Sequence, residues 1–206
     1  MKILILGGGP AGLYSGALIK KSHPGWDITV IERNPHDATY GWGVVFSDRT
    51  LGSFREADYT SFREITNRFV IWDTIDVRYA GESIRCGGNI FAGISRKILL
   101  MLLQDRCRDF GVKLEFLTEV RDLSNYKDYD FIIAADGINS IVRKTYADHF
   151  KPKLVYGKTK FIWLGTRKIF DAFTFSFRRN EHGLFQAHVY PNDGAASTFI
   201  VQCDPE

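Results

Sequence analysis

The stretch that decides the fold is Ile3-Leu4-Ile5-Leu6-Gly7-Gly8-Gly9-Pro10-Ala11-Gly12, close to the N-terminus. An apolar run of strand length leads into a turn with glycines at its first, third and sixth positions, and a helix-compatible segment follows. Gly7 suits a tight turn, Gly9 lets the backbone approach a pyrophosphate, and Gly12 lets the helix pack closely. The order therefore predicts a strand–turn–helix unit that binds a dinucleotide at the helix N-terminus.

A second apolar run supports this interpretation. Ile28-Thr29-Val30-Ile31 follows the predicted helix as a parallel partner strand should, and it ends in Glu32, twenty residues after Gly12. A carboxylate at this point accepts hydrogen bonds from the hydroxyls of an adenosine ribose and repels a 2′-phosphate. A glycine-rich turn alone is weak evidence, but strand, turn, helix, strand and acid together favour dinucleotide binding over a purely structural turn. These residues leave open which dinucleotide binds.

Length and composition narrow the class of protein to which the chain can belong. The chain has 206 residues, of which 45% are apolar and 25% charged, as is typical of a soluble globular protein of one or two domains. No run has the length of a membrane span and no signal peptide is evident, so we expect a cytoplasmic protein without a membrane partner. A scattered net charge of +3 does not indicate a nucleic acid partner. Cys86, Cys107 and Cys203 are far apart and odd in number, which predicts free thiols and no metal site.

Periodicity predicts the remaining organisation. Helices are expected over 11–22, 50–67 and 95–111, an antiparallel excursion over 68–94 with a hairpin turn at 80–83, and strands over 112–116, 129–135, 161–165, 172–178, 184–190 and 197–202. The continuous apolar run at 129–135 predicts a parallel strand buried on both faces. We therefore expect an α/β fold with a Rossmann-like, parallel-sheet domain of residues 1–67 and 95–152. An antiparallel β-sheet domain of residues 68–94 and 153–206 should accompany it.

Four further features each allow a structural and a functional interpretation. The loop Gly41-Trp42-Gly43-Val44-Val45-Phe46-Ser47-Asp48 suits either contact with a flat ligand or an apolar surface anchor. Arg96, in the first turn of a helix, is either solvated or paired with an anion. Asp136-Gly137-Ile138-Asn139-Ser140-Ile141-Val142-Arg143 follows a strand at the sheet edge where α/β proteins bind ligands. His188 could transfer a proton or serve a structural role within its strand.

In combination, these motifs resemble the single-component FAD-dependent aromatic hydroxylases. The resemblance rests on Gly7-x-Gly9-x-x-Gly12, Glu32, Arg96 in a Ser-Arg-x-x-Leu context, and Asp136-Gly-x-x-Ser140-x-x-Arg143. The segments 41–48, 162–166, 186–190 and 197–201 are similar to the group of these hydroxylases that acts on salicylyl-CoA and 2-aminobenzoyl-CoA. The similarity extends over essentially the whole chain.

The resemblance implies roles for individual residues but no catalytic side chain, since the flavin carries the chemistry. FAD would be bound at its pyrophosphate by the glycine turn, at its ribose by Glu32, and elsewhere by Arg96 and by Asp136-Gly137, which also contribute to nicotinamide binding in the family. The implied cofactor-binding residues are Gly7, Gly9, Pro10, Ala11, Gly12, Glu32, Arg33, Arg96, Asp136 and Gly137. The implied residues on the substrate side are Trp42, Val45, Phe46 and His188.

The function implied is hydroxylation of a small aromatic substrate, with aromatic acyl-CoA thioesters as one class, using NADPH or NADH and molecular oxygen. A homodimer is compatible with the resemblance. The family's second Gly-Asp motif does not occur before Glu206, so we expect an N-terminal fragment with a truncated sheet domain and no activity alone. The alternatives are a flavin-dependent double-bond reductase and a non-catalytic dinucleotide-binding module.

Overall fold

The computed structural model describes residues 1–204, apart from the side chain of Asp48. The chain divides into two compact units. Unit 1 comprises Met1–Ala38 and Leu99–Leu154, and unit 2 comprises Thr39–Ile98 and residues 155–204. The chain therefore passes three times from one unit to the other, and each unit is built from two separate segments.

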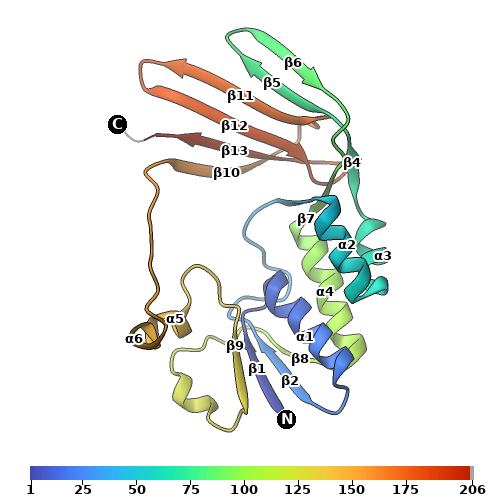
Figure 1. Ribbon diagram of the computed structural model, residues 1–206, viewed down its shortest axis with the longest axis vertical. Helices are drawn as coiled ribbons and strands as arrows, with labels where there is room; N and C mark the ends of the chain where they lie inside the picture. Colours follow the sequence, from blue (N-terminus) through green and yellow to red (C-terminus); the bar gives the residue numbers. More distant parts are fainter. Residues whose placement is uncertain (205–206) are drawn as a thin grey trace. The chain divides into compact units, whose positions relative to one another are not determined.

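Unit 1 contains a parallel sheet of four strands in the order β8-β2-β1-β9 (Figure 1). Its strands are β1 (Lys2–Leu6), β2 (Asp27–Ile31), β8 (Lys113–Glu115) and β9 (Phe131–Ala134). Its helices are α1 (Pro10–Ser22), the part of α4 (Arg96–Phe110) from Leu99 onward, the 3-10 turn η1 (Leu123–Tyr126), α5 (Ile141–Thr145) and α6 (Ala147–Phe150). Leu6 pairs with Ile31 on one side and with Ala134 on the other, so three strands end at the same edge.

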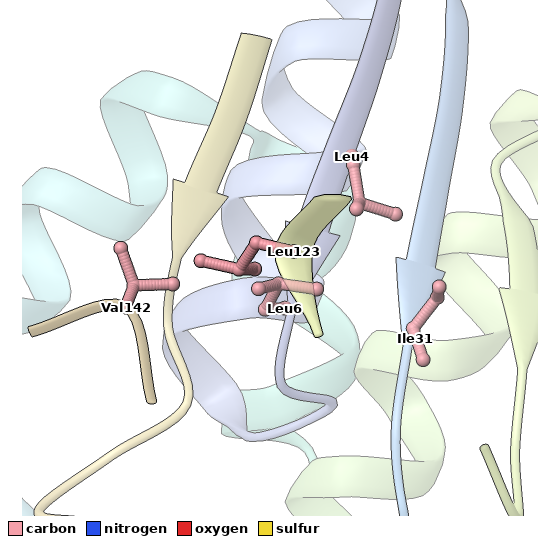
Figure 2. Close-up of a cluster of buried hydrophobic side chains, with 5 residues drawn as sticks. All are labelled: Leu4, Leu6, Ile31, Leu123 and Val142. Atoms are coloured by element: carbon pink, nitrogen blue, oxygen red, sulfur yellow. The ribbon is translucent and has the colours of Figure 1, made fainter. Parts of the chain in front are cut away.

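Apolar side chains on both faces of β1 hold unit 1 together. Leu4, Leu6 and Ile31 form a buried cluster with Leu123 and Val142, which come from segments more than 90 residues away in sequence (Figure 2). Helix α1 approaches the sheet closely because Gly16 has no side chain: a Cβ there would lie 3.2 Å from Val30 and 3.3 Å from Ile5. Burial of this apolar surface provides most of the stabilisation of the unit.

Unit 2 is dominated by a six-stranded sheet in the order β10-β13-β12-β11-β5-β6 (Figure 1). Its strands are β10 (Lys160–Thr166), β11 (Phe173–Asn180), β12 (Gly183–Pro191), β13 (Ser197–Cys203), β5 (Ile75–Tyr79) and β6 (Glu82–Cys86). A second, antiparallel sheet has the order β3-β7-β4, with β3 (Gly43–Phe46), β7 (Phe91–Ser95) and β4 (Val70–Trp72). Two helices follow β3, α2 (Asp48–Ala57) and α3 (Tyr59–Thr66).

The main elements expected from periodicity are confirmed, including the Rossmann-like parallel sheet, the four late strands and the hairpin at 80–83. Two expectations about individual elements are wrong. The single helix over 50–67 is two helices, because buried Asp58 ends α2 and caps α3, its carboxylate accepting from the Ser61 N–H at 3.2 Å. Strand β9 is not buried on both faces: it lies at the edge of the four-stranded sheet, and Phe131 is 58% exposed.

Pairing within unit 2 also differs in detail from the expected antiparallel excursion. Strand β5 pairs antiparallel with β6 but parallel with β11, a partner about 100 residues later. Residues 39–67, expected with the parallel-sheet domain, belong to unit 2 because β3 pairs with β7 there. Within the described chain, no helix combines the length and apolar character needed to cross a membrane.

Candidate functional site

The glycine-rich turn of unit 1 has the backbone geometry that the sequence predicts. Gly7 has a φ of +105°, a conformation that side chains disfavour, and its N–H donates to the Ile31 carbonyl at 2.8 Å. Gly9 is the N-cap of α1 and provides no side-chain cap, while Pro10 occupies the first turn. The first intrahelical bond runs from the Leu13 N–H to the Gly9 carbonyl at 3.0 Å. The earlier N–H groups of the helix are thus available to an anion.

Close packing around the turn explains why glycines are required there. A Cβ on Gly12 would lie 1.9 Å from the Gly7 carbonyl oxygen, and one on Gly7 would lie 2.3 Å from the Ala135 carbonyl oxygen. No described atom lies within 4 Å of the corresponding point at Gly9. The turn is therefore closed on the side of the sheet and open at Gly9, where a pyrophosphate would approach the backbone.

Glu32 lies directly against this turn. One carboxylate oxygen accepts from the Gly8 N–H at 2.8 Å, and the other accepts from the Asn34 N–H at 2.9 Å and from the Asn34 side-chain amide at 2.6 Å. These bonds fix the orientation of the carboxylate beside the turn while leaving lone pairs for further donors. Arg33, also expected in the site, is exposed.

Asp136 and Gly137 follow β9 at the same edge of the sheet. One carboxylate oxygen of Asp136 accepts from the Ile141 N–H at 2.6 Å, whereas the other is buried without a partner in the described part of the chain. Ser140 caps α5 by accepting from the Arg143 N–H at 3.0 Å. These residues line a hollow of about 370 Å³. The unpartnered oxygen needs a hydrogen-bond donor, which a bound ligand could supply.

In unit 2, Arg96 begins α4 and lies beside the loop before β3. Its N–H donates to the Trp42 carbonyl at 2.8 Å, and its side-chain Nε is buried without a partner among the described residues. A buried guanidinium nitrogen at a helix N-terminus favours an anionic neighbour, because the helix dipole opposes the cation. Arg96 is thus brought next to Trp42.

The loop before β3 interlocks with β10 through two glycine–tryptophan contacts. The indole of Trp42 lies on Gly165, where an added Cβ would be 2.4 Å from the ring, and the indole of Trp163 lies on Gly41, at 2.8 Å from such an atom. Trp42 keeps 49% of its surface exposed. Sequence reasoning identified Trp42 but not these contacts, since the two segments lie about 120 residues apart.

The two other loop candidates differ in burial. Val45, in the middle of β3, is half-buried. Phe46 is 6% exposed and packs against the rings of Phe54, at 5.8 Å, and Phe69, at 5.4 Å. Phe46 is therefore a core residue of unit 2, and its expected role as a contact on the substrate side is not supported by its position.

His188 lies on an aromatic face of the six-stranded sheet, called here the His188 face. The cross-strand row through it contains Trp163, Ile200, His188, Phe175 and Val77. The ring of Phe175 meets the imidazole edge-on at a centroid distance of 5.1 Å. Alternation along the strands predicts the face, but the row itself depends on pairing between distant segments.

Gln186, which sequence reasoning missed, fixes the state of this imidazole. Its amide nitrogen lies 2.7 Å from His188 Nε2, so Nε2 accepts and Nδ1 carries the proton. Burial lowers the pKa of His188, because desolvation penalises the charged form. A neutral imidazole with a free Nδ1–H can donate a hydrogen bond to a carbonyl or hydroxyl oxygen of a ligand.

The residues of unit 1 fit FAD. The open glycine turn and α1 N-terminus suit a pyrophosphate, Glu32 suits a ribose, and the unpartnered buried oxygen of Asp136 is a group that a polar cofactor would satisfy. The described residues thus contain the donor set expected for a dinucleotide that carries an adenosine diphosphate group.

Comparison with known proteins agrees with this chemistry. The chain is 43% identical over its whole length to the salicyloyl-CoA 5-hydroxylase of a Streptomyces species and covers 40% of that protein. It is 33% identical to the protodeoxyviolaceinate monooxygenase of Chromobacterium violaceum, covering 56% of it, and 30% identical to the 3-hydroxy-4-methyl-anthranilyl-[aryl-carrier protein] 5-monooxygenase of Streptosporangium sibiricum, covering 57%. The chain thus spans about half the length of these relatives.

Solved structures show the same fold at low sequence identity. The tetrameric form of 2-methyl-3-hydroxypyridine-5-carboxylic acid oxygenase matches 98% of this chain, and 58% of its own, with a TM-score of 0.81 at 18% identity. PqsL of Pseudomonas aeruginosa, described as a probable FAD-dependent monooxygenase, matches 99% of this chain, and 60% of its own, with a TM-score of 0.72 at 16% identity. The model of the FAD binding domain family matches residues 1–129, which include the glycine turn and Glu32. The chain therefore belongs to the FAD binding domain family.

Proposed function

We propose that the protein is an FAD-dependent monooxygenase that hydroxylates an aromatic substrate with NADH or NADPH and molecular oxygen. The observation that carries the proposal is the open glycine turn beside Glu32, in a chain that aligns over its whole length with three monooxygenases. Unit 1 would be the main FAD-binding domain, and unit 2 would provide a wall of the substrate site.

Bound FAD would supply the redox chemistry, taking electrons from the nicotinamide and activating oxygen. The N–H groups of Ala11 and Gly12 would bind the pyrophosphate, with Gly7 shaping the turn and Gly9 leaving it open, and Glu32 would bind the ribose. Pro10, Arg33, Arg96, Asp136 and Gly137 complete the proposed cofactor-binding set. These residues orient the cofactor and take no part in the chemical steps.

On the substrate side, we propose that Trp42, Val45 and the His188 face contact the aromatic ring. Flat aromatic side chains would hold the ring in orientation and exclude water from the site. His188 Nδ1–H would donate a hydrogen bond to a substrate oxygen. The neutral state of the imidazole supports this role, because only the Nδ1–H remains free once Nε2 accepts from Gln186.

A narrower proposal concerns the substrate class. Two relatives act, by their names, on aromatic acyl groups carried by coenzyme A or by an aryl-carrier protein, and both modify ring position 5. We therefore propose an aromatic acyl thioester as the substrate, rather than a free aromatic acid. We also propose that the enzyme is cytoplasmic. A homodimer remains a separate prediction, which light scattering would check.

The test measures oxidation of NADH and NADPH by the FAD-loaded full-length protein that contains this chain, with salicyloyl-CoA, benzoyl-CoA and free salicylate as candidate substrates. We expect oxidation that depends on oxygen and on the thioester, and a product 16 mass units heavier, the mass of one added oxygen atom. Substrate-dependent turnover without oxygen, giving a product that has gained two hydrogens, would instead identify a double-bond reductase. A protein that stays colourless after reconstitution with FAD would contradict both proposals.

A matched pair of variants tests the cofactor assignment. Glu32→Ala removes the carboxylate beside the glycine turn, and we expect the Kd for FAD to rise at least tenfold, since hydrogen bonds to charged groups contribute about 1.5–3 kcal/mol. Glu119→Ala removes an exposed carboxylate of the same unit that pairs with Arg121, and it should leave the Kd unchanged. Equal FAD affinities in both variants would remove Glu32 from the site.

A further inference from the structure

The six-stranded sheet of unit 2 has a hollow of about 330 Å³ on the face opposite the His188 face. Side chains alternate between the two faces of a strand, so Ala187 and Val189 point away from the face that carries His188. The hollow lies over β11, β12 and β13 and is lined only by residues of unit 2. Its volume lies within the range of small-molecule sites, about 300–1,000 Å³.

The shape of the hollow follows from the sizes of its side chains. Small residues form the floor along three neighbouring strands, with Thr174 and Ser176 on β11, Ala187 on β12 and Val201 on β13. Large apolar side chains form the walls: Phe170, Phe185 and Phe199. Small residues surrounded by aromatic ones leave a depression suited to a flat ring, because aromatic walls offer edge-on and offset contacts.

The charge around this hollow is entirely positive among its lining residues, which include Arg78, Lys168 and Arg178. Arg78 is neutralised by Asp76, whose carboxylate lies 3.1 Å away. Asp171, three residues from Lys168, pairs with Arg85 at 3.1 Å, and Glu181, three residues from Arg178, lies 3.6 Å from the imidazole of His182. Two cations are thus left for a ligand.

Lys168 and Arg178 form no ion pair with any carboxylate that the structure describes. The ammonium of Lys168 lies 5.1 Å from the ring centre of Phe170, and Arg178 pairs across the strands with Phe185. Each free cation therefore lies beside an aromatic wall. Arg178 is four residues from Thr174, about 13 Å along β11. Lys168 precedes β11 and lies beside Phe170, whose N–H donates to Ser197 at the start of β13, so the two cations lie towards different ends of the hollow.

We propose that this hollow is a binding site for an aromatic carboxylate. The ring would lie on the small residues of the floor between the phenylalanines, and the carboxylate would pair with Lys168 or Arg178 at the rim. The proposal rests on an apolar, aromatic depression that has two unpaired cations at its rim. A neutral ring would contact only the apolar floor and an inorganic anion only the cations, whereas an aromatic carboxylate would contact both. The site is separate from the His188 face and does not depend on the proposed function.

The test uses calorimetric titration of the FAD-loaded full chain with 2-naphthoate and with the neutral isostere 2-naphthamide. We expect a binding event for the acid that weakens at least tenfold in the double variant Lys168→Ala/Arg178→Ala. The matched control is Arg167→Ala/Arg179→Ala, which removes the same charge from the adjacent exposed positions outside the lining and should leave binding unchanged. Binding of the amide should be at least tenfold weaker than that of the acid.

A second variant tests the floor independently of charge. Ser176→Leu fills the depression from a half-buried position, and we expect it to abolish the same binding event while circular dichroism shows an intact fold. Aromatic acids that enter the proposed substrate site would give a separate event, insensitive to these changes. The proposal is overturned if no event responds to Lys168→Ala/Arg178→Ala, if the control double variant weakens binding equally, or if folded Ser176→Leu binds normally.

Discussion

Replacing Gly165 by alanine tests how strongly the loop before β3 is attached to the large sheet. The added Cβ would lie 2.4, 2.5 and 2.6 Å from three atoms of the Trp42 indole, distances that real Cβ atoms do not adopt. The ring must move by about 1 Å to restore a normal contact of about 3.5 Å. The backbone φ of Gly165 is compatible with alanine, so the clash alone determines the effect.

The clash can be relieved in two ways, and both predict a similar loss in the free energy of unfolding. If the indole stays in place, the strand deforms, and overpacking of this kind costs about 1–3 kcal/mol. If the half-exposed indole swings away, it re-exposes about 100 Å² of apolar surface, or about 2.5 kcal/mol at 25 cal/mol/Å². We therefore expect Gly165→Ala to lower the free energy of unfolding by about 1–3 kcal/mol, measured by urea unfolding.

A double-mutant cycle isolates the contact. In a Trp42→Ala background the clash is absent, so Gly165→Ala should cost less than about 0.5 kcal/mol, leaving a coupling energy of at least about 1 kcal/mol. Gly52→Ala provides the control, because no described atom lies within 4 Å of its added Cβ and alanine favours the helix by about 0.5–1 kcal/mol. An equal cost of Gly165→Ala in both backgrounds would refute the packing argument.

The remaining predictions concern three other local environments. The Arg85 and Arg78 guanidiniums hold the pKa of Asp76 below its ordinary value of 3.8, so the carboxylate stabilises the fold above pH 3.8 and this contribution is lost as the pH falls through the lower folded-state pKa. In urea unfolding between pH 5 and 2, Asp76→Asn should therefore be less stable than the wild type at pH 5, and its free energy of unfolding should fall less on acidification. Burial raises the pKa of Cys107 to about 12, so its thiol should resist a disulfide reagent at pH 8 in native protein while exposed Cys86 reacts, as mass spectrometry would show; equal labelling rates would contradict the burial of Cys107. Gly12→Ala should abolish FAD binding in fluorescence titrations, because its Cβ would lie 1.9 Å from a carbonyl oxygen of the turn; retention of wild-type affinity would contradict that packing.

Local signals in the sequence predicted the parts of the structure that depend on neighbouring residues. The turn at Gly7 and the carboxylate of Glu32 belong to one strand–helix–strand unit of about 30 residues, whose spacing is fixed by backbone geometry. The late strands follow from alternation and from turn residues such as Gly183, which has a φ of +112°. The sequence pattern therefore predicts the backbone geometry wherever the interacting residues lie close together in the sequence.

Features that depend on distant segments could not be predicted in this way. Periodicity does not show that β5 takes β11 as a parallel partner, that Trp42 packs on Gly165, or that Gln186 sets the tautomer of His188. The split of the helix at Asp58 was in principle readable, because an aspartate three residues before Ser61 resembles an N-cap. The edge position of β9 depends on the order in which the strands pair, and an apolar run in the sequence does not indicate that order.

The strand order of unit 1 has a consequence for biosynthesis. Strand β1 needs β9 as its second neighbour, yet more than 120 residues separate them, and the whole of unit 2's first segment is translated in between. At about 5–20 residues per second, the ribosome delivers β9 roughly 6–25 s after β1. During that interval the apolar residues of β1 keep one unpaired edge on the nascent chain, so a chaperone that shields short apolar segments would have its main opportunity to act at this edge.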